Sequence, residues 1–140
     1  MNHSLPNIQF KLVSPEKVLY TGEASMVVLP VITGSLGVLY NHAPTVVTLG
    51  QGIIDVYHGE NLTERLFVWG GFANVNETEC IAMADDAVSV EDLHESEVQE
   101  RIVELEDEID HAKVEEEKQE LLRNLLIAET KLEIIKRLKK

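Results

Sequence analysis

All glycine, proline and aromatic residues of this 140-residue chain lie within its first 72 positions. The last proline is Pro44, the last glycine is Gly71 and the last aromatic residue is Phe72. Because glycine and proline mark turns and interrupt helices, the first part should form short strands joined by turns, and the rest should be helical. The pattern predicts an α+β chain with a β domain in residues 1–86 and a helical domain in residues 87–140.

The β domain alternates short apolar stretches with turn residues. Ile8, Phe10 and Leu12 alternate with polar residues, as in a strand with one buried face. Residues 25–30 and 45–49 are continuous apolar runs, as expected of strands buried on both faces. The close spacing of these stretches, with Gly, Asn and Asp between them, predicts an antiparallel β-sandwich or barrel.

The helical domain is expected to begin near Ser89 or Asp92, since either side chain could cap a helix. Its apolar residues form two seams that are out of phase and separated by a break near residues 112–118. The break favours two helices folded back as an antiparallel hairpin, because a single long helix with a shifted stripe would leave both seams in water. The first seam is Val98, Ile102, Leu105, Ile109 and Ala112, and the second is Leu121, Leu125, Ala128, Leu132 and Ile135.

The net charge of −13 is distributed unevenly along the helices. Residues 86–120 carry 15 acidic and 3 basic side chains, whereas residues 121–140 carry 2 acidic and 6 basic ones. In an antiparallel hairpin the basic end of the second helix would lie beside the acidic start of the first, which suits both helix dipoles and forms a weak, salt-sensitive latch. The acidic start is Glu91, Asp92, Glu95 and Glu97, and the basic residues are Arg123, Lys131, Lys136, Arg137, Lys139 and Lys140.

Composition also limits the partners of the chain. A strong negative charge disfavours direct binding to nucleic acid or to anionic lipid, so proteins are the expected partners. No apolar run approaches the ~20 residues that a membrane span requires, and the first residues do not resemble a signal peptide. The single cysteine, Cys80, lies in an apolar stretch and is expected to be a small core residue.

Residues 34–44, with two glycines, His42 and Pro44, form the densest local motif. No Gly-Lys-Ser/Thr follows, as a phosphate-binding loop requires, and no basic neighbours suit an RNA clamp. The five histidines show no metal-ligand spacing, and no serine lies in a Gly-x-Ser-x-Gly elbow. We expect no catalytic, nucleotide or metal site and no cofactor. The residues alone favour His42 as a turn residue bonded to local backbone, with a role in an interface or in pH sensing as the alternative.

Residues 34–44 resemble the Gly-Glu-x-Gly-x-x-x-x-His-x-Pro signature of the epsilon subunits of F-type ATP synthases. Residues 13–16 and 19–24 resemble the opening of that family, residues 68–75 its Ser-Gly-Gly-x-x-Glu-Val strand pair, and residues 82–85 its Leu-Ala-Asp ending. The resemblance covers the whole chain, because members of the family also continue into a two-helix hairpin of about this length.

The resemblance implies a ten-stranded sandwich at the foot of the central stalk, which binds the gamma subunit and the c-ring and turns with them. Ser35 and His42 would contact the c-ring. The hairpin would either fold against the sandwich or extend along gamma to the alpha and beta subunits, where its basic end would block ATP hydrolysis. The chain would be a non-catalytic subunit, peripheral on the cytoplasmic face of a bacterial plasma membrane and held there by proteins and not by lipid.

Three departures from the family pattern are informative. Ser35 stands where the signature usually has Glu, so the ring contact is expected to be less acidic, and Asn74 also stands where Glu is common. Some members bind ATP through Ile-Asp-x-x-Arg-Ala, but residues 90–95 read Val-Glu-Asp-Leu-His-Glu and lack the arginine that would hold phosphate. ATP binding is therefore not expected. The alternatives to a rotor subunit are a free-standing sandwich adaptor whose hairpin binds a client helix, and an ATP-binding regulator.

Overall fold

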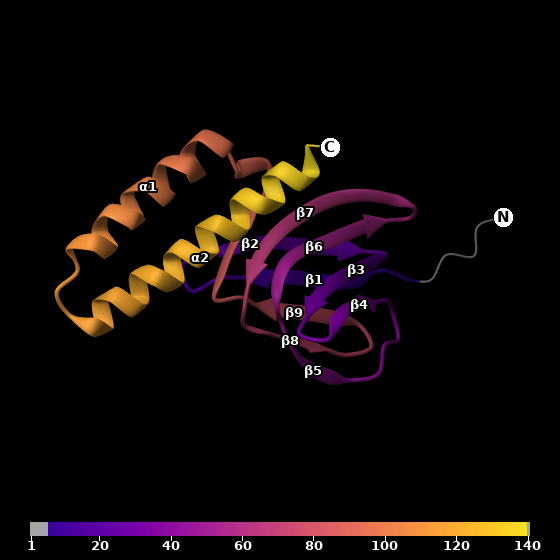
Figure 1. Cartoon of the computed structure of the whole chain (residues 1–140). Coiled ribbons are helices and arrows are strands. Elements are labelled where there is room, and N and C mark those ends of the chain that lie inside the picture. Colours follow the sequence, from indigo (N-terminus) through magenta and orange to yellow (C-terminus); the bar gives the residue numbers. More distant parts are fainter. Residues whose placement is uncertain (1–5, 140) are drawn as a thin grey trace. The chain divides into compact units, whose positions relative to one another are not determined.

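The computed structural model describes residues 6–139, and the chain divides into two compact units, Met1–Val90 and Glu91–Lys140. The first unit is a β-sandwich and the second is a pair of helices (Figure 1). This arrangement confirms the predicted fold class. The strands are β1 Ile8–Val13, β2 Val18–Ala24, β3 Met26–Val31, β4 Gly34–Val38, β5 Thr45–Thr48, β6 Gln51–His58, β7 Asn61–Trp69, β8 Phe72–Val75, β9 Glu79–Met83 and β10 Asp86–Ser89.

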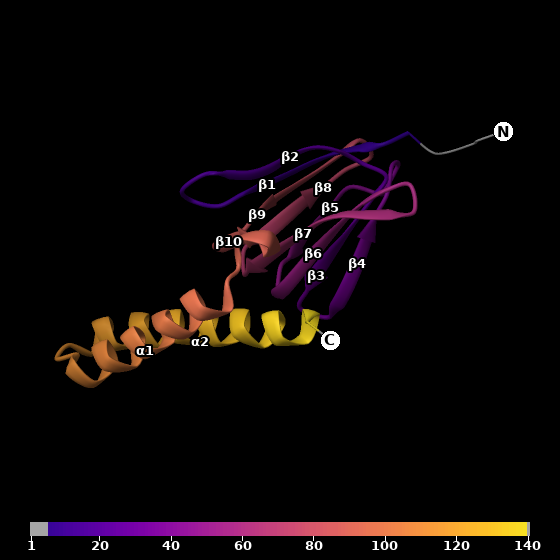
Figure 2. The same ribbon diagram turned by 90° about the horizontal axis from the view of Figure 1, so that it is seen from above.

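The ten strands form two five-stranded sheets, in the orders β2-β1-β9-β8-β5 and β10-β7-β6-β3-β4. Figure 2 shows the two sheets as two layers. Neighbouring strands are antiparallel except β1 and β9, which pair in parallel from Gln9 with Glu79 to Val13 with Met83. The parallel pair departs from a purely antiparallel prediction, because it joins strands that are about 70 positions apart and is invisible to local patterns.

One core fills the space between the sheets, and Ile8, Phe10 and Leu12 of β1 lie in it as their alternation predicted. The expectation that the runs 25–30 and 45–49 are buried on both faces is wrong. In β3 only alternate residues are fully buried, and in β5 Val46 is 64% exposed. The physical reason is that a two-layer sandwich covers only the inner face of each strand.

The chain passes from β7 to β8, and from one sheet to the other, through Gly70 and Gly71, both with positive φ. Gly71 has φ 100°, and a Cβ atom there would collide with the carbonyl oxygen of Met83. Only glycine fits this corner, because a side chain would meet both an unfavourable backbone conformation and the backbone of β9.

The helices of the second unit follow a short 3₁₀ turn, Val90–Asp92, and they are α1 Glu95–His111 and α2 Glu115–Leu138. The predicted start of the first helix is therefore too early. Ser89 is the last residue of β10, where it pairs with Leu66 of β7, so strand pairing has overridden its capping preference. The residue at the N-cap is His94, whose side chain makes no capping hydrogen bond.

The two helices pack as the antiparallel hairpin that the seams predicted (Figure 1). Leu105 of α1 and Leu121 and Ala128 of α2 are buried together between them. The turn that joins the helices, residues 112–114, contains no glycine and no proline. Both helix N-termini lack a side-chain cap, so packing of the seams contributes most of the stability of this unit. The half-buried residues around the hairpin core are Ile102, Ile109, Ala112 and Leu125.

Candidate functional site

The sequence singled out two residues in the sandwich, Ser35 within strand β4 and His42 in the loop after it. Ser35 is exposed near the start of β4, opposite Pro30 of β3. His42 is half-buried in the loop of residues 39–44 that follows β4 and leads to β5 in the other sheet. Both strands lie at the edge of their sheets.

The loop around His42 is held by backbone hydrogen bonds. The His42 amide donates to the Leu39 carbonyl at 3.2 Å, which closes a tight turn, and Asn41 adopts φ 70° within it. The Asn41 amide donates to the Glu77 carbonyl at 2.7 Å, which anchors the loop to the turn between β8 and β9. Asparagine tolerates this left-handed conformation better than most residues, which explains its place in the turn.

The His42 ring is oriented by a hydrogen bond between its Nδ1 atom and the Ala43 carbonyl oxygen, at 2.7 Å. A carbonyl only accepts, so Nδ1 carries the proton and donates it. When the ring is neutral, Nε2 is then an acceptor that is available to a partner. His42 is thus a turn residue bonded to local backbone, and its ring still offers one nitrogen for an interface.

The structure does not bring Ser35 and His42 together. Val31 pairs with both Gly34 and Leu49, so the start of β4 lies beside the end of β5. His42 lies beyond the other end of β4. At the usual rise of a strand, the stretch from Ser35 to Val38 alone spans about 10 Å. The two residues therefore mark opposite ends of one side of the sandwich.

This side of the sandwich has a property that the motifs do not reveal. Residues 24–54 contain no Asp, Glu, Lys or Arg, although 26% of the chain is charged. They include all of β3, β4 and β5, and their most exposed apolar side chains are those of Ile32, Val46 and Leu39. The lack of charged residues between positions 24 and 54 is visible in the sequence. A motif search does not find it, because motifs are defined by the residues that are present.

In the hairpin, the predicted latch has a specific contact at its ends. Lys139, the C-cap of α2, places its Nζ atom 2.5 Å from Oε1 of Glu95, the first residue of α1. The hydrogen bond and the charge of Lys139, with a contribution from Lys136, lower the pKa of Glu95. The antiparallel hairpin therefore brings the basic end of α2 to the acidic start of α1.

The other basic residues of α2 differ in their exposure to solvent. Arg123 and Arg137 are exposed and lie 14 positions apart, which places them on the same face of the helix. Lys131 is half-buried. Lys140 lies outside the described residues. The six basic residues that were predicted to inhibit hydrolysis therefore do not form one group. Lys136 and Lys139 lie near the start of α1, whereas Arg123 and Arg137 are exposed to solvent.

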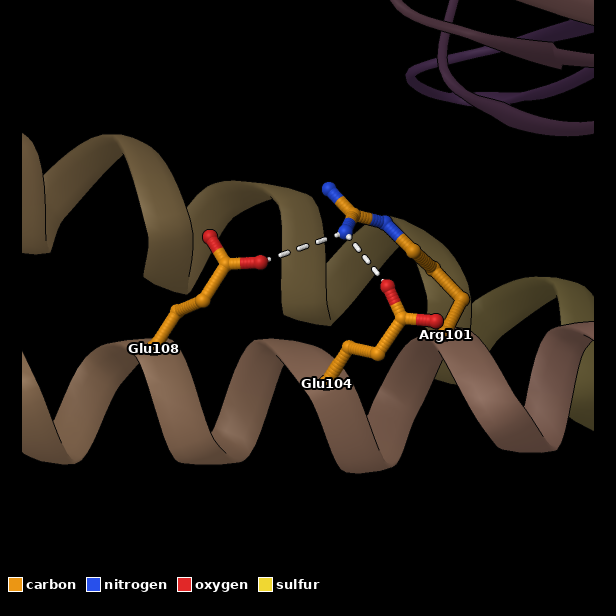
Figure 3. A network of polar contacts seen from close by, with 3 residues as sticks. All are labelled: Arg101, Glu104 and Glu108. Carbon is orange, nitrogen blue, oxygen red and sulfur yellow. Dashed lines mark hydrogen bonds and ion pairs between the residues drawn. The ribbon is translucent and has the colours of Figure 1, made fainter.

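Helix α1 contains one more ionic network. Nη1 of Arg101 lies 3.5 Å from carboxylate oxygens of both Glu104 and Glu108, between two successive turns (Figure 3). Arg101 is the only Arg or Lys in α1, so it offsets part of the repulsion among the acids of that helix. Sequence reasoning did not single out this residue, although its spacing of three and seven from the two acids was visible.

Within residues 6–139, no group of three or more His, Cys, Asp and Glu side chains is arranged to hold a metal ion. No helix in this part of the chain combines the length and apolarity of a membrane span. Glu95, which stands where the motif Ile-Asp-x-x-Arg-Ala has its alanine, makes the contact with Lys139.

Comparison with known proteins decides the family. Residues 7–90 match the family described as ATP synthase, Delta/Epsilon chain, beta-sandwich domain. The ATP synthase epsilon chain of Rhodospirillum centenum is 40% identical over 134 residues, which cover 91% of this chain and 91% of that protein. This chain belongs to the ATP synthase epsilon chain family. The epsilon chain of Rhodospirillum rubrum is 39% identical and covers 89% of this chain and 92% of its own length.

Chains in two solved structures share this fold. A chain in the cryo-EM structure of the Euglena gracilis mitochondrial ATP synthase, which contains OSCP, F1 and the c-ring, is similar with a TM-score of 0.64. The identity is 22%, and the match covers 99% of this chain and 82% of that one. A chain in the central stalk and c-ring of the Tetrahymena thermophila enzyme has a TM-score of 0.51 at 15% identity, covering 62% and 69%. Members of the family are non-catalytic subunits, as the sequence predicted for this chain.

Proposed function

We propose that this epsilon chain is a rotor subunit in the central stalk of an F-type ATP synthase, where it couples rotation of a proton-driven c-ring to ATP synthesis and can inhibit ATP hydrolysis. Family membership supports the first part, and similar chains have been solved within assemblies that contain a c-ring. The sandwich binds the gamma subunit and the c-ring. The chain is then peripheral on the cytoplasmic face of a bacterial plasma membrane and is held there by its protein partners.

The observation that carries the inhibitory part is the Glu95–Lys139 contact, which closes the two ends of the hairpin. Both side chains are accessible to water, and salt screens such a contact, so the hairpin can open without breaking a buried network. Opening frees Lys136 and Lys139 to join Arg123 and Arg137 in a contact with an acidic surface on the alpha and beta subunits.

Deletion of residues 121–140 tests the inhibitory part in the assembled enzyme. We expect ATP hydrolysis to rise by roughly fivefold, within the usual range of coupling between sites, while the complex stays assembled. Since the deletion also exposes the seam of α1, a second variant keeps both helices and changes Arg123 and Arg137 to Gln. Its matched control changes Lys11 and Lys17 of the sandwich to Gln. Hydrolysis that is unchanged in both test variants would exclude an inhibitory role for the basic end.

A change of His42→Ala tests the predicted ring contact. If His42 contributes to coupling, ATP-driven proton pumping falls relative to ATP hydrolysis. Because the ring also holds the turn, a His42→Asn variant, whose amide can donate to the Ala43 carbonyl, separates loss of the turn from loss of the contact. Wild-type pumping by both variants would restrict His42 to a structural role.

Purification from native membranes separates the rotor proposal from its alternatives. Co-purification with gamma and the catalytic subunits supports a rotor subunit, and their absence supports a free-standing adaptor. An ATP-binding regulator would show a melting temperature that rises with ATP. We expect no such rise, because residues 90–95 contain three acids and neither Arg nor Lys.

A further inference from the structure

The outer face of the sheet β2-β1-β9-β8-β5 carries a row of side chains that crosses all five strands. Residues that pair between neighbouring strands form this row, in the order Thr48, Phe72, Met83, Val13 and Val18. Each of them stands next to a residue that packs in or against the sandwich core. Because successive side chains of a strand point to opposite faces, the row points away from the core. We call it the outer row.

The outer row is mostly apolar, and Met83 lies at its centre. Val18 is 51% exposed, Phe72 is 44% exposed and Met83 is 37% exposed. Met83 belongs to β9, the central strand of the sheet, so Phe72 and Val13 stand on either side of it at the strand spacing of about 5 Å. The other sulfur-containing side chains of residues 6–139 are less accessible, since Cys80 is fully buried and Met26 is half-buried.

The backbone of Met83 is fixed while its side chain faces water. Strand β9 pairs with β8 on one side and with β1 on the other, and the Met83 carbonyl oxygen packs against Gly71. A chemical change at the end of the side chain therefore alters the surface and leaves the strand in place. Met26 differs, because its sulfur packs over Gly37 of the next strand, 3.8 Å from the position of a Cβ atom there.

We propose that Met83 is a site of reversible oxidation by hydrogen peroxide, which makes the outer row polar without unfolding the sandwich. A lone pair of Sδ attacks one peroxide oxygen, and the S–O bond forms as the O–O bond breaks. The hydroxide that leaves takes up the proton of the transferred hydroxyl group. The products are methionine sulfoxide and water, so sulfur has lost two electrons and the peroxide has gained them.

Oxidation changes what the outer row offers to its surroundings. The sulfoxide oxygen accepts hydrogen bonds, so water is held between Phe72 and Val13, where the thioether left an apolar surface. Reductases reverse the change, and two thiols that supply the electrons become a disulfide while the oxygen leaves as water. The apolar character of this face then follows the level of peroxide, and it recovers when the peroxide is removed.

Oxidation rates test the accessibility of the sulfur. The purified full chain is treated with hydrogen peroxide in buffer and in denaturant, and mass spectrometry of its peptides follows Met83 and Met26 separately. We expect folding to slow the oxidation of Met83 by less than about tenfold, and to slow that of Met26 more, because susceptibility follows exposure. A larger loss of rate at Met83, or protection at least equal to that of Met26, would overturn the proposal.

Two variants test the change of surface. Met83→Leu nearly keeps the side-chain volume and cannot take up oxygen, and Met26→Leu is its matched control. After peroxide treatment, the wild type and Met26→Leu should elute earlier from a hydrophobic-interaction column, by more than Met83→Leu does. Any effect of Met1 is common to the three proteins. Methionine sulfoxide reductases with a dithiol should restore the original elution. An equal shift in Met83→Leu would overturn the proposal.

Urea unfolding tests whether the sandwich survives the change. The midpoint of the oxidised wild type should lie within about 0.5 M of the untreated protein, as for a change on the surface. A larger fall that Met83→Leu does not show would mean that oxidation of Met83 disrupts the fold. That result would overturn the proposal of a change confined to the surface.

Discussion

Lys139 Nζ lies 2.5 Å from Glu95 Oε1, so the C-cap of α2 is joined to the first residue of α1. The contact links residues that are 44 positions apart, and it closes the open end of a hairpin whose other end is a short turn. The hairpin core of Leu105, Leu121 and Ala128 lies between these two ends. The ends can therefore separate while the core still holds the helices together.

Lys139→Gln should separate the ends of the hairpin without unfolding it. Spin labels at Ser96 and Leu138, both exposed, report the separation as a broader distance distribution. The same broadening should appear in the wild type at high salt, because screening weakens an exposed ion pair. Lys113→Gln, in the turn at the other end, is the control that should leave the distribution unchanged. A distribution that is equally narrow in both variants would show that packing alone closes the hairpin.

Acid should have the same effect as loss of Lys139. The pKa of Glu95 is lowered below its ordinary value of 4.5 by the hydrogen bond from Lys139 and by its charge. The contribution of the contact to stability is therefore complete above pH 4.5 and is lost as the pH falls through the lowered pKa. The spin-label distance should broaden over that range in the wild type and be independent of pH in Lys139→Gln.

His111 should titrate above its ordinary pKa of 6.5. Its Nδ1 atom bonds to the Asp107 carbonyl at 2.8 Å, and this bond, followed by the charges of Asp107 and Asp110, raises the pKa of the ring. The protonated ring also suits the C-terminal end of α1. Its contribution to hairpin stability is present below pH 6.5 and is lost as the pH rises through the raised pKa.

NMR titration of the His111 ring checks this prediction. Asp107→Asn should lower the pKa only in part, because the backbone carbonyl remains as an acceptor. Unfolding the protein in urea should return the pKa to its ordinary value. A ring that titrates normally in the folded chain would show that the contact with Asp107 does not persist in solution.

Gly71→Ala should destabilise the sandwich by roughly 2–4 kcal/mol, because the new methyl group meets the Met83 carbonyl at a backbone φ of 100°. Gly59→Ala is the matched control. Gly59 also has a positive φ, of 63°, but a Cβ atom added there would have no neighbour within 4 Å. It should cost about 1–2 kcal/mol, the backbone term alone. Urea unfolding measures both, and equal losses would mean that the corner has room for a side chain.

Cys80 should not react with thiol reagents in the folded protein. The side chain is fully buried in the sandwich core, and burial raises the pKa of its thiol to about 12. The reactive thiolate is therefore scarce at about pH 8. Labelling with iodoacetamide should be slow in buffer and fast in denaturant. Rapid labelling in buffer would indicate that β8 and β9 separate frequently.

Much of the fold follows from local patterns. The alternation in β1 correctly predicted its buried residues, and the two seams correctly placed Leu105, Leu121 and Ala128 in the hairpin core, because the period of a strand or helix depends on neighbouring residues. The seams missed Ile127 and Ile134 of α2, which are also buried. The start of α1 did not follow, because Ser89 pairs with Leu66 of a distant strand. Tertiary pairing of this kind leaves no signal within the segment itself.

The sequence was enough to name the candidate site residues, but it did not show how they are arranged. The motif that contains Ser35 and His42 was recognisable, but strand β4 places the two residues at opposite ends of one side. The contact between Glu95 and Lys139 followed from the opposite charges of the helices once an antiparallel hairpin was inferred. The structure was needed to show that β4 and β5, both in the stretch of residues 24–54 without Asp, Glu, Lys or Arg, are each at an edge of their sheets.

The parallel pairing of β1 with β9 has a consequence for biosynthesis. Strand β1 cannot pair with β9 until Glu79 and the residues after it have been synthesised. Nearly the whole of the first unit must therefore leave the ribosome before this sheet can form. Pairings between distant segments also form slowly compared with local ones. The helical hairpin, whose contacts are local, emerges after the sandwich and needs little further time to fold. Completion of the first sheet is thus the step at which a nascent chain most needs protection from aggregation.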